Sequence, residues 1–129
     1  KLDIFADELE RRQNVASHYA ALLEGVVGTP SLAAGVTSSW AQYVIQLPQG
    51  SDRNAICKSL ANSGVPTAIY YPVPMHRQPP YAHYPVSACN LPVTMDLCDH
   101  VLALPMHPYL ETAQQAHIAN SLKDALATS

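Results

Sequence analysis

The sequence predicts a single domain of the α/β (α+β) class, with a small, mainly antiparallel three-stranded sheet and helices packed mostly on one of its faces. The chain has 129 residues, of which 48% are hydrophobic, and this composition suits one compact core. Segments with helical apolar spacing alternate with short apolar runs that favour strands. Nine of the eleven prolines fall between Pro66 and Pro108, which indicates long connections between those elements. We therefore treat residues 1–129 as one domain.

The first half of the chain predicts a helix, a strand and a second helix. Apolar residues spaced three and four apart run from Leu2 to Leu23, opposite a charged face, and favour a long amphipathic helix. Residues 40–47 alternate in polarity, which predicts a strand whose odd-numbered positions face the core. Ser51 is the expected N-cap of a helix over residues 52–63.

The second half predicts two further strands and two further helices. Residues 67–71 favour the second strand, and a proline-rich loop follows it to about residue 90. A short helix over residues 92–99 leads into a buried strand over residues 101–104. Thr112 is the expected N-cap residue of a capping box that starts the last helix.

Composition excludes several classes of function. The net charge is −3 and no lysine or arginine cluster is present, which argues against a nucleic-acid partner. No apolar run approaches the ~20 residues needed to span a bilayer, so we expect a cytoplasmic protein with no membrane partner. The chain has three cysteines, Cys57, Cys89 and Cys98, and no two of them have Cys-x-x-Cys spacing. We therefore expect them to be reduced thiols.

The segment from Tyr70 to Tyr81 is the strongest candidate for a binding surface. Its prolines restrict the backbone, so that it leaves the second predicted strand as a stiff, non-helical segment. Its polar side chains therefore face outward at defined angles, which suits a small polar ligand. Binding residues are also concentrated on loops that a rigid scaffold holds in place.

A metal site is an alternative for the same region. Six potential ligands lie in or after this segment, between residues 76 and 107: His76, His83, Cys89, Cys98, His100 and His107. Zinc sites show closely paired ligands, and only Cys98 and His100 form such a pair. The pattern therefore favours metal binding less than binding of an organic ligand.

Several segments, in order along the chain, resemble one protein family. Residues 71–78 are similar to the family's His-Tyr-Pro-x-Pro-x-His-x-Gln pattern, and the Leu-Pro-Met-His-Pro run of residues 104–108 follows at the expected distance. Further matches lie in the opening helix, the first strand and the last helix: Glu10, Arg11, Arg12, Trp40, Gln42, Tyr43, Gln114 and Gln115. Over nearly its whole length the chain resembles the C-terminal small domain of the DegT/DnrJ/EryC1/StrS aminotransferases. These are fold-type I pyridoxal-phosphate enzymes that aminate keto sugars attached to nucleotides, in sugar or surface-polysaccharide biosynthesis.

The resemblance implies that the cofactor is bound elsewhere. Family members hold pyridoxal phosphate in a large N-terminal domain, through a Schiff-base lysine, and this chain has no counterpart of that domain. Its only lysines, Lys1, Lys58 and Lys123, lie far in sequence from the tyrosine and histidine segment. We therefore expect no catalytic residue, no cofactor and no transamination in this chain alone.

The resemblance also implies a substrate-binding site. The positions of Tyr70 and Tyr71 contact the sugar in the assembled active site, and His76 lies just behind them. Tyr70 stands where the family commonly has histidine, and Arg77 where it usually has an apolar residue. Arg77 is a candidate partner for a carboxylate or phosphate. His107 is expected to anchor its own loop through backbone groups.

Two functions remain open at this stage. In the first, the chain is the small domain of a sugar aminotransferase, with a nucleotide-linked sugar and a pyridoxal-phosphate domain as partners. In the second, it is a stand-alone sugar-nucleotide-binding or accessory domain that lost the cofactor half. In both cases uncovered apolar faces favour a homodimer or other self-association.

Overall fold

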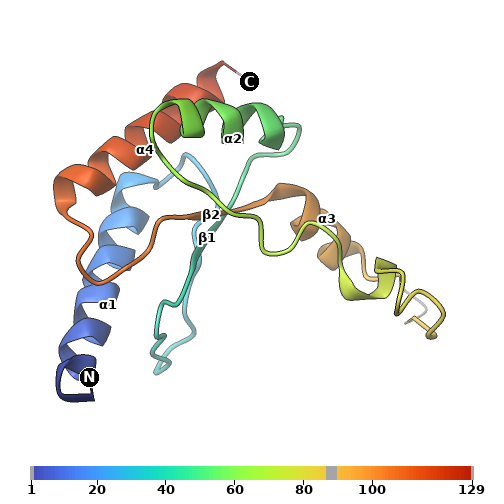
Figure 1. Cartoon of the computed structure of the whole chain (residues 1–129), viewed down its shortest axis with the longest axis horizontal. Coiled ribbons are helices and arrows are strands. Elements are labelled where there is room, and N and C mark those ends of the chain that lie inside the picture. Colours follow the sequence, from blue (N-terminus) through green and yellow to red (C-terminus); the bar gives the residue numbers. More distant parts are fainter. Residues whose placement is uncertain (1, 87–89, 129) are drawn as a thin grey trace.

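The computed structural model describes residues 2–86 and 90–128. Along the chain lie η1 (Leu2–Ile4), α1 (Phe5–Leu22), β1 (Tyr43–Gln46), α2 (Arg53–Asn62), η2 (Met75–Arg77), α3 (Pro92–His100), β2 (Val101–Leu104) and α4 (Thr112–Ala127). Figure 1 shows two regions, which we call the body and the arm. The body consists of α1, α2, α4 and the sheet. The arm, residues 72–86 and 90–100, contains η2 and α3 and extends away from it.

The sheet has two strands in the described part of the chain, so the predicted three-stranded sheet is wrong. β1 and β2 pair antiparallel, from Tyr43 opposite Leu104 to Gln46 opposite Val101. The segment predicted as the remaining strand forms only an isolated bridge, in which Ala68 and Ala103 exchange hydrogen bonds of 3.2 and 2.8 Å. Prolines at positions 66 and 72 bracket that segment, and proline has no amide hydrogen with which to extend a ladder.

The core lies between the sheet and three helices. The strand predicted over residues 40–47 is shorter, Tyr43–Gln46, and the predicted alternation is confirmed from residue 43 onward, because residues 43, 45 and 47 are buried while their neighbours are less so. These residues pack against side chains of α1, α2 and α4, which cover one face of the sheet (Figure 1). The largest fully buried side chains are Tyr19, Leu23, Tyr43, Ile45, Ile56, Leu60, Val65, Leu102 and Leu122.

The first turns of the opening helix differ from the prediction. Leu2 is 87% exposed and Phe5 is 53% exposed, and the buried stripe of α1 begins only at Val15. Figure 1 shows why: the start of α1 extends past the end of α4 and meets no other element. The apolar spacing therefore indicates a face that could be covered, but nothing in the described chain buries Leu2 or Phe5.

Both predicted helix caps are displaced by one residue. The N-cap of α2 is Asp52, whose carboxylate accepts hydrogen bonds of 3.0 Å from the amides of Asn54 and Ala55. An acidic N-cap also interacts favourably with the positive end of the helix dipole, which favours Asp52 over Ser51. The N-cap of α4 is Glu111, which forms the capping box with Gln114, so the predicted N-cap at Thr112 is wrong by one residue.

The helices of the structure bear on the expected absence of a membrane span. Among the described residues, no helix combines the length and the apolar character that a membrane span requires. The longest helix, α1, has 18 residues but carries charges along it, including Asp7, Glu8, Arg11 and Arg12.

Candidate functional site

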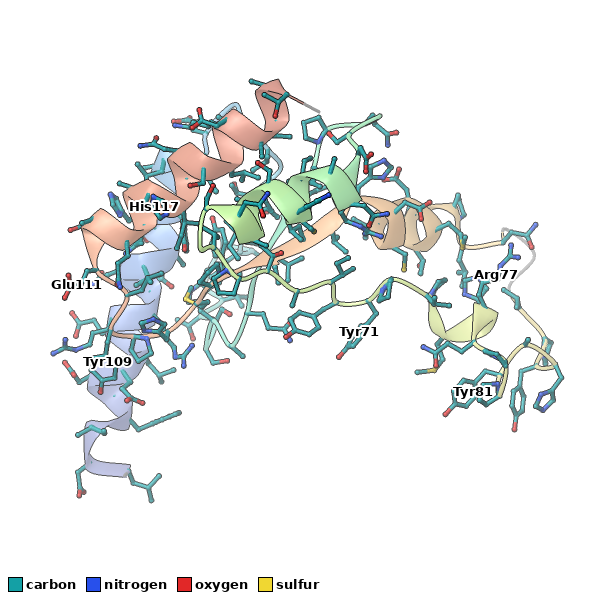
Figure 2. All side chains as sticks on the ribbon, turned by 45° about the horizontal axis from the view of Figure 1, so that its top comes forward. Tyr71, Arg77, Tyr81, Tyr109, Glu111 and His117 are labelled. Carbon is teal, nitrogen blue, oxygen red and sulfur yellow. The ribbon has the colours of Figure 1, made fainter. Side chains whose placement is uncertain are left out.

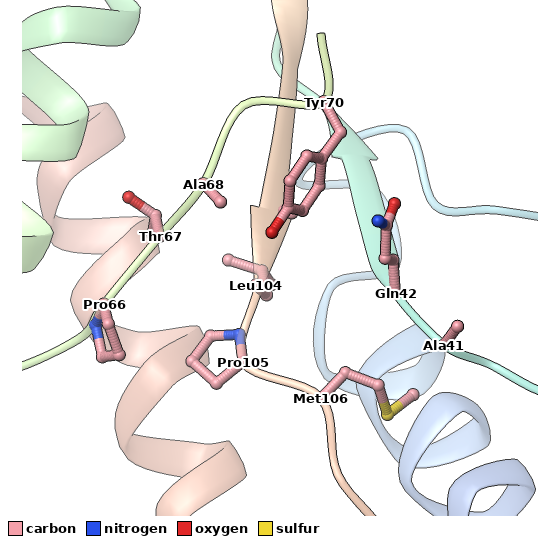
Figure 3. A pocket seen from close by; sticks show the side chains of 10 residues that line it. Ala41, Gln42, Pro66, Thr67, Ala68, Tyr70, Leu104, Pro105 and Met106 are labelled. Carbon is pink, nitrogen blue, oxygen red and sulfur yellow. The ribbon is translucent and has the colours of Figure 1, made fainter.

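An open cavity of about 270 Å³ lies on the face of the sheet opposite the core helices (Figure 3). Its walls come from the residues before β1, from the bridged segment and from the end of β2. The lining residues are Ala41, Gln42, Pro66, Thr67, Ala68, Tyr70, Ala103, Leu104, Pro105 and Met106. Most of these side chains are small or apolar, and Gln42, Thr67 and Tyr70 bring polar groups.

Tyr70 forms one side of this cavity. Its ring extends toward Leu104, and the side chain of Gln42 lies next to it (Figure 3). The ring of Tyr71 meets that of Tyr70 edge to face, with 5.7 Å between the centroids. Tyr71 itself does not line the cavity and points away from the sheet (Figure 2). The two tyrosines thus form a small aromatic surface at the mouth of the cavity.

The other two predicted site residues lie on the arm. His76 and Arg77 belong to η2, beyond Tyr71 along the proline-rich segment (Figure 2). His76 is half-buried and borders an apolar cavity of about 420 Å³ that also reaches Tyr81 and Tyr84. Arg77 is exposed. The structure therefore brings Tyr70 and Tyr71 together, and it places His76 and Arg77 as a second pair further out.

A buried tyrosine supports the lining of the cavity from the core side. The Tyr19 hydroxyl donates a hydrogen bond of 3.0 Å to the carbonyl of Pro105, a lining residue. Burial raises the pKa of Tyr19, and burial also raises the pKa of Tyr43 to about 12. Both hydroxyls therefore stay protonated at neutral pH, and Tyr19 remains a donor to this carbonyl.

A second set of contacts fixes the loop that follows the cavity. The amide of Tyr109 donates to His107 Nδ1 at 3.2 Å, which confirms the predicted anchoring role of His107. The Tyr109 hydroxyl donates to Glu8 at 2.8 Å, and this bond raises the pKa of Tyr109. The guanidinium of Arg11 lies 5.7 Å from the centre of the Tyr109 ring, in a cation–π contact. The loop from Pro105 is thereby tied to α1.

Polar contacts between α2, the preceding loop and α3 hold the base of the arm. Arg53 donates to the carbonyls of Cys98 and Val101, at 2.6 and 3.2 Å. The side chain of Gln49 donates to Asp96 at 2.6 Å. The positive charge of Arg53 also interacts favourably with the negative, C-terminal end of the α3 helix dipole. Sequence reasoning missed this set because its members lie more than 40 residues apart.

Comparison with known proteins decides the family. A sequence model of the DegT/DnrJ/EryC1/StrS aminotransferase family matches residues 1–123. The chain belongs to this family. It is 40% identical, over 88% of its length, to the UDP-2-acetamido-2-deoxy-3-oxo-D-glucuronate aminotransferase of Pseudomonas aeruginosa. It is 37% identical, over 89% of its length, to a UDP-N-acetyl-3-dehydro-alpha-D-glucosamine 3-aminotransferase of Acidithiobacillus ferrooxidans. It spans 30% of each relative.

Solved structures of the family share the fold. A DegT DnrJ EryC1 StrS aminotransferase from Brucella abortus superposes with a TM-score of 0.90 at 40% identity, over 97% of this chain and 33% of that one. The family uses pyridoxal phosphate, and its structures include a pyridoxamine-phosphate (PMP) form of Spr1654 from Streptococcus pneumoniae. That likeness, at 22% identity and a TM-score of 0.88, bears on the fold alone.

The described residues of this family member do not fit pyridoxal phosphate. Lys58 is exposed on α2 and Lys123 is half-buried on α4, and neither lines the cavity beside Tyr70. Lys1 lies outside the described residues. A Schiff base needs a lysine whose amine reaches the cofactor carbonyl, and neither described lysine is placed at the candidate site.

The zinc alternative gains no support from the described residues. Residues 2–86 and 90–128 contain no group of three histidine, cysteine or acidic side chains that could hold a metal ion. His100 instead places Nδ1 at 2.8 Å from the carbonyl of Asp96 and at 3.2 Å from its carboxylate. Cys89 falls outside the described residues.

Proposed function

We propose that this chain forms the sugar-binding side of a nucleotide-sugar aminotransferase and acts together with a pyridoxal-phosphate domain. One observation carries the proposal: the family motif leaves the sheet beside an open cavity, with Tyr70 in its wall. The chain spans about a third of the structures it matches, so the catalytic machinery belongs to the remainder of the enzyme. Alone, the chain is expected to be inactive.

The proposed substrate is a UDP-linked 2-acetamido-3-oxo hexose. The two relatives described above, at 40% and 37% identity, are named for such sugars. Relatives named for dTDP-linked sugars are less similar, at 22–32% identity. A sugar ring has an apolar face and a polar edge, and the two exposed tyrosine rings offer matching surfaces.

His76 and Arg77 are proposed to contact the same ligand from the arm. Arg77 is exposed and carries a guanidinium that can pair with a carboxylate or phosphate in bidentate geometry. His76 is half-buried beside it and can donate or accept a hydrogen bond. Since these residues lie beyond Tyr71 along the arm, they would reach parts of the ligand outside the cavity (Figure 2).

Exposed apolar side chains support a protein partner as well. Leu2, Phe5, Met75 and Val93 are all more than half exposed, at the tip of α1 and on the arm. The proposed cover is the pyridoxal-phosphate domain of the same enzyme, with a second copy of the chain as a further contact. Sedimentation of the purified gene product tests the contact with a second copy, because a strict monomer would contradict self-association.

Calorimetric titration tests the ligand. The purified gene product is expected to bind UDP-N-acetylglucosamine, and Tyr71→Phe should weaken binding about two- to tenfold through the loss of one hydroxyl. Tyr109→Phe is the matched control, because Tyr109 is also an exposed tyrosine but, unlike Tyr71, has no ring contact with Tyr70. Absence of binding to any nucleotide-linked hexose would reject the proposal.

A stand-alone binding or accessory domain is the alternative. It shares the cavity and the tyrosines but needs no cofactor domain. The reading frame upstream of Lys1 distinguishes the two: a continuous frame encoding the pyridoxal-phosphate domain supports the aminotransferase, and a start codon without it supports the accessory domain. Transamination, or an imine absorbance, from the 129 residues by themselves would contradict both.

A further inference from the structure

Building on the proposed function, we infer that the cavity beside Tyr70 receives the acetamido group of the sugar. Its volume of about 270 Å³ lies just below the ~300 Å³ at which pockets for whole small-molecule ligands begin. A complete nucleotide sugar therefore cannot enter it. One ring substituent can, while the ring itself stays at the mouth beside the tyrosines.

The walls of the cavity suit a methyl group. Ala41, Ala68 and Ala103 each present a single methyl, from three different segments of the chain. Pro66, Leu104, Pro105 and Met106 add further apolar surface, and Thr67 and Tyr70 add hydroxyl groups (Figure 3). The apolar part of this surface favours removal of a methyl group from water.

Gln42 supplies a matching polar partner. Its carboxamide has a donor and an acceptor, and no described residue forms a hydrogen bond with it. An acetamido group has one N–H donor and one carbonyl acceptor, which point in opposite directions in a trans amide, so Gln42 can pair with one of them through one hydrogen bond. A hydroxyl on the same sugar carbon has neither the amide carbonyl nor the methyl. The cavity should therefore discriminate between the two substituents.

The test compares UDP-N-acetylglucosamine with UDP-glucose, which differ only in this substituent. Titrated into the purified gene product, the first is expected to bind about tenfold more tightly, since one amide hydrogen bond and one methyl contact distinguish them. Equal affinities would overturn the acetamido inference and leave the proposed sugar-nucleotide function standing. Binding of neither ligand would reject both.

Two cavity variants test whether the preference for UDP-N-acetylglucosamine over UDP-glucose arises in this cavity. Gln42→Ala should remove most of this preference while leaving UDP-glucose affinity within about twofold. Gln114→Ala changes a glutamine outside the cavity and should keep the preference. Ala41→Leu fills the cavity from an exposed position, so it should lower UDP-N-acetylglucosamine affinity selectively without disturbing the fold. A preference that survives both cavity variants would place the acetamido group elsewhere and overturn the inference.

Discussion

The body and the arm of this molecule are stabilised in different ways. In the body, three helices bury a continuous apolar core against the two-stranded sheet. In the arm, neither η2 nor α3 buries a side chain, and apolar residues such as Tyr84 and Val93 face solvent. Polar contacts to Arg53 and Gln49 hold the arm's base. The free energy of folding therefore resides mainly in the body, while the arm is free to adapt to a ligand or partner.

The largest expected effect compares one leucine from each region. Leu102 in β2 is 0% exposed, and Leu97 in α3 is 38% exposed. Leu102→Ala should lower the free energy of unfolding by about 2–5 kcal/mol, because it removes buried contacts and leaves a cavity. Leu97→Ala should change it by only about 0.5 kcal/mol. Urea denaturation of the purified gene product measures both.

Equal losses in the two variants would break the comparison. They would mean that the arm is covered in solution, either by another part of the enzyme or by a second copy of the chain. Repeating the denaturation over a range of protein concentrations separates these cases, because only association between copies makes the unfolding midpoint depend on concentration.

The next effect concerns the base of the arm. Arg53→Ala removes two hydrogen bonds from a charged donor to the end of α3, worth about 1.5–3 kcal/mol. Amides of α3 should then exchange about ten- to a hundredfold faster, while amides of β1 keep their protection. Arg77→Ala is the matched control, since that arginine is exposed on the arm. Unchanged exchange in α3 after Arg53→Ala would show that other contacts hold the arm.

The sequence was sufficient for the parts of the body that depend on local pattern. Alternation over residues 40–47 identified the buried face of β1, and the helix predicted over residues 52–63 matches α2 to within one residue at each end. The predicted N-caps were off by one residue, because Ser51 and Asp52 both carry a capping oxygen and only the geometry distinguishes them. The local sequence therefore limits the N-cap to two adjacent residues but does not show which of them caps the helix.

Other features depend on information that no local pattern contains. Apolar spacing predicted a buried face for the first turns of α1, but burial also requires a covering element, and the described chain supplies none there. The strand predicted at residues 67–71 has suitable side chains, yet it pairs with its neighbour through Ala68 alone. Contacts such as Gln49 with Asp96 join residues far apart in sequence and leave no motif.

The candidate site was located by family resemblance rather than by physics. The proline-rich segment was a plausible binding surface from its composition, but the motif is what singled out Tyr70, Tyr71, His76 and Arg77. Their roles in ligand binding stay predictions. The structure adds Gln42 as a further candidate, because the cavity joins it to Tyr70 from a segment 28 residues away.

The smallest effect again compares the same change in two places. The Tyr43 hydroxyl is buried in the body and has no hydrogen-bond partner among the described residues, whereas Tyr71 is 67% exposed beside the arm. Tyr43→Phe should raise the free energy of unfolding by up to about 1 kcal/mol, because it removes an unsatisfied polar group. Tyr71→Phe should leave stability within about 0.5 kcal/mol while weakening ligand binding.

Alkaline pH sharpens this last comparison. Burial raises the pKa of Tyr43 from 10.0 to about 12, so between these values the folded state keeps a proton that the unfolded state loses. Stability contributed by this group is therefore complete below pH 10 and is lost as the pH rises toward 12, with a slope of at most about 1.4 kcal/mol per pH unit. Denaturation of Tyr43→Phe should show a shallower alkaline loss than the wild type, with the part due to Tyr19 remaining. A variant less stable than the wild type at neutral pH would instead indicate that the hydroxyl binds a buried water, whose hydrogen bonds the substitution removes.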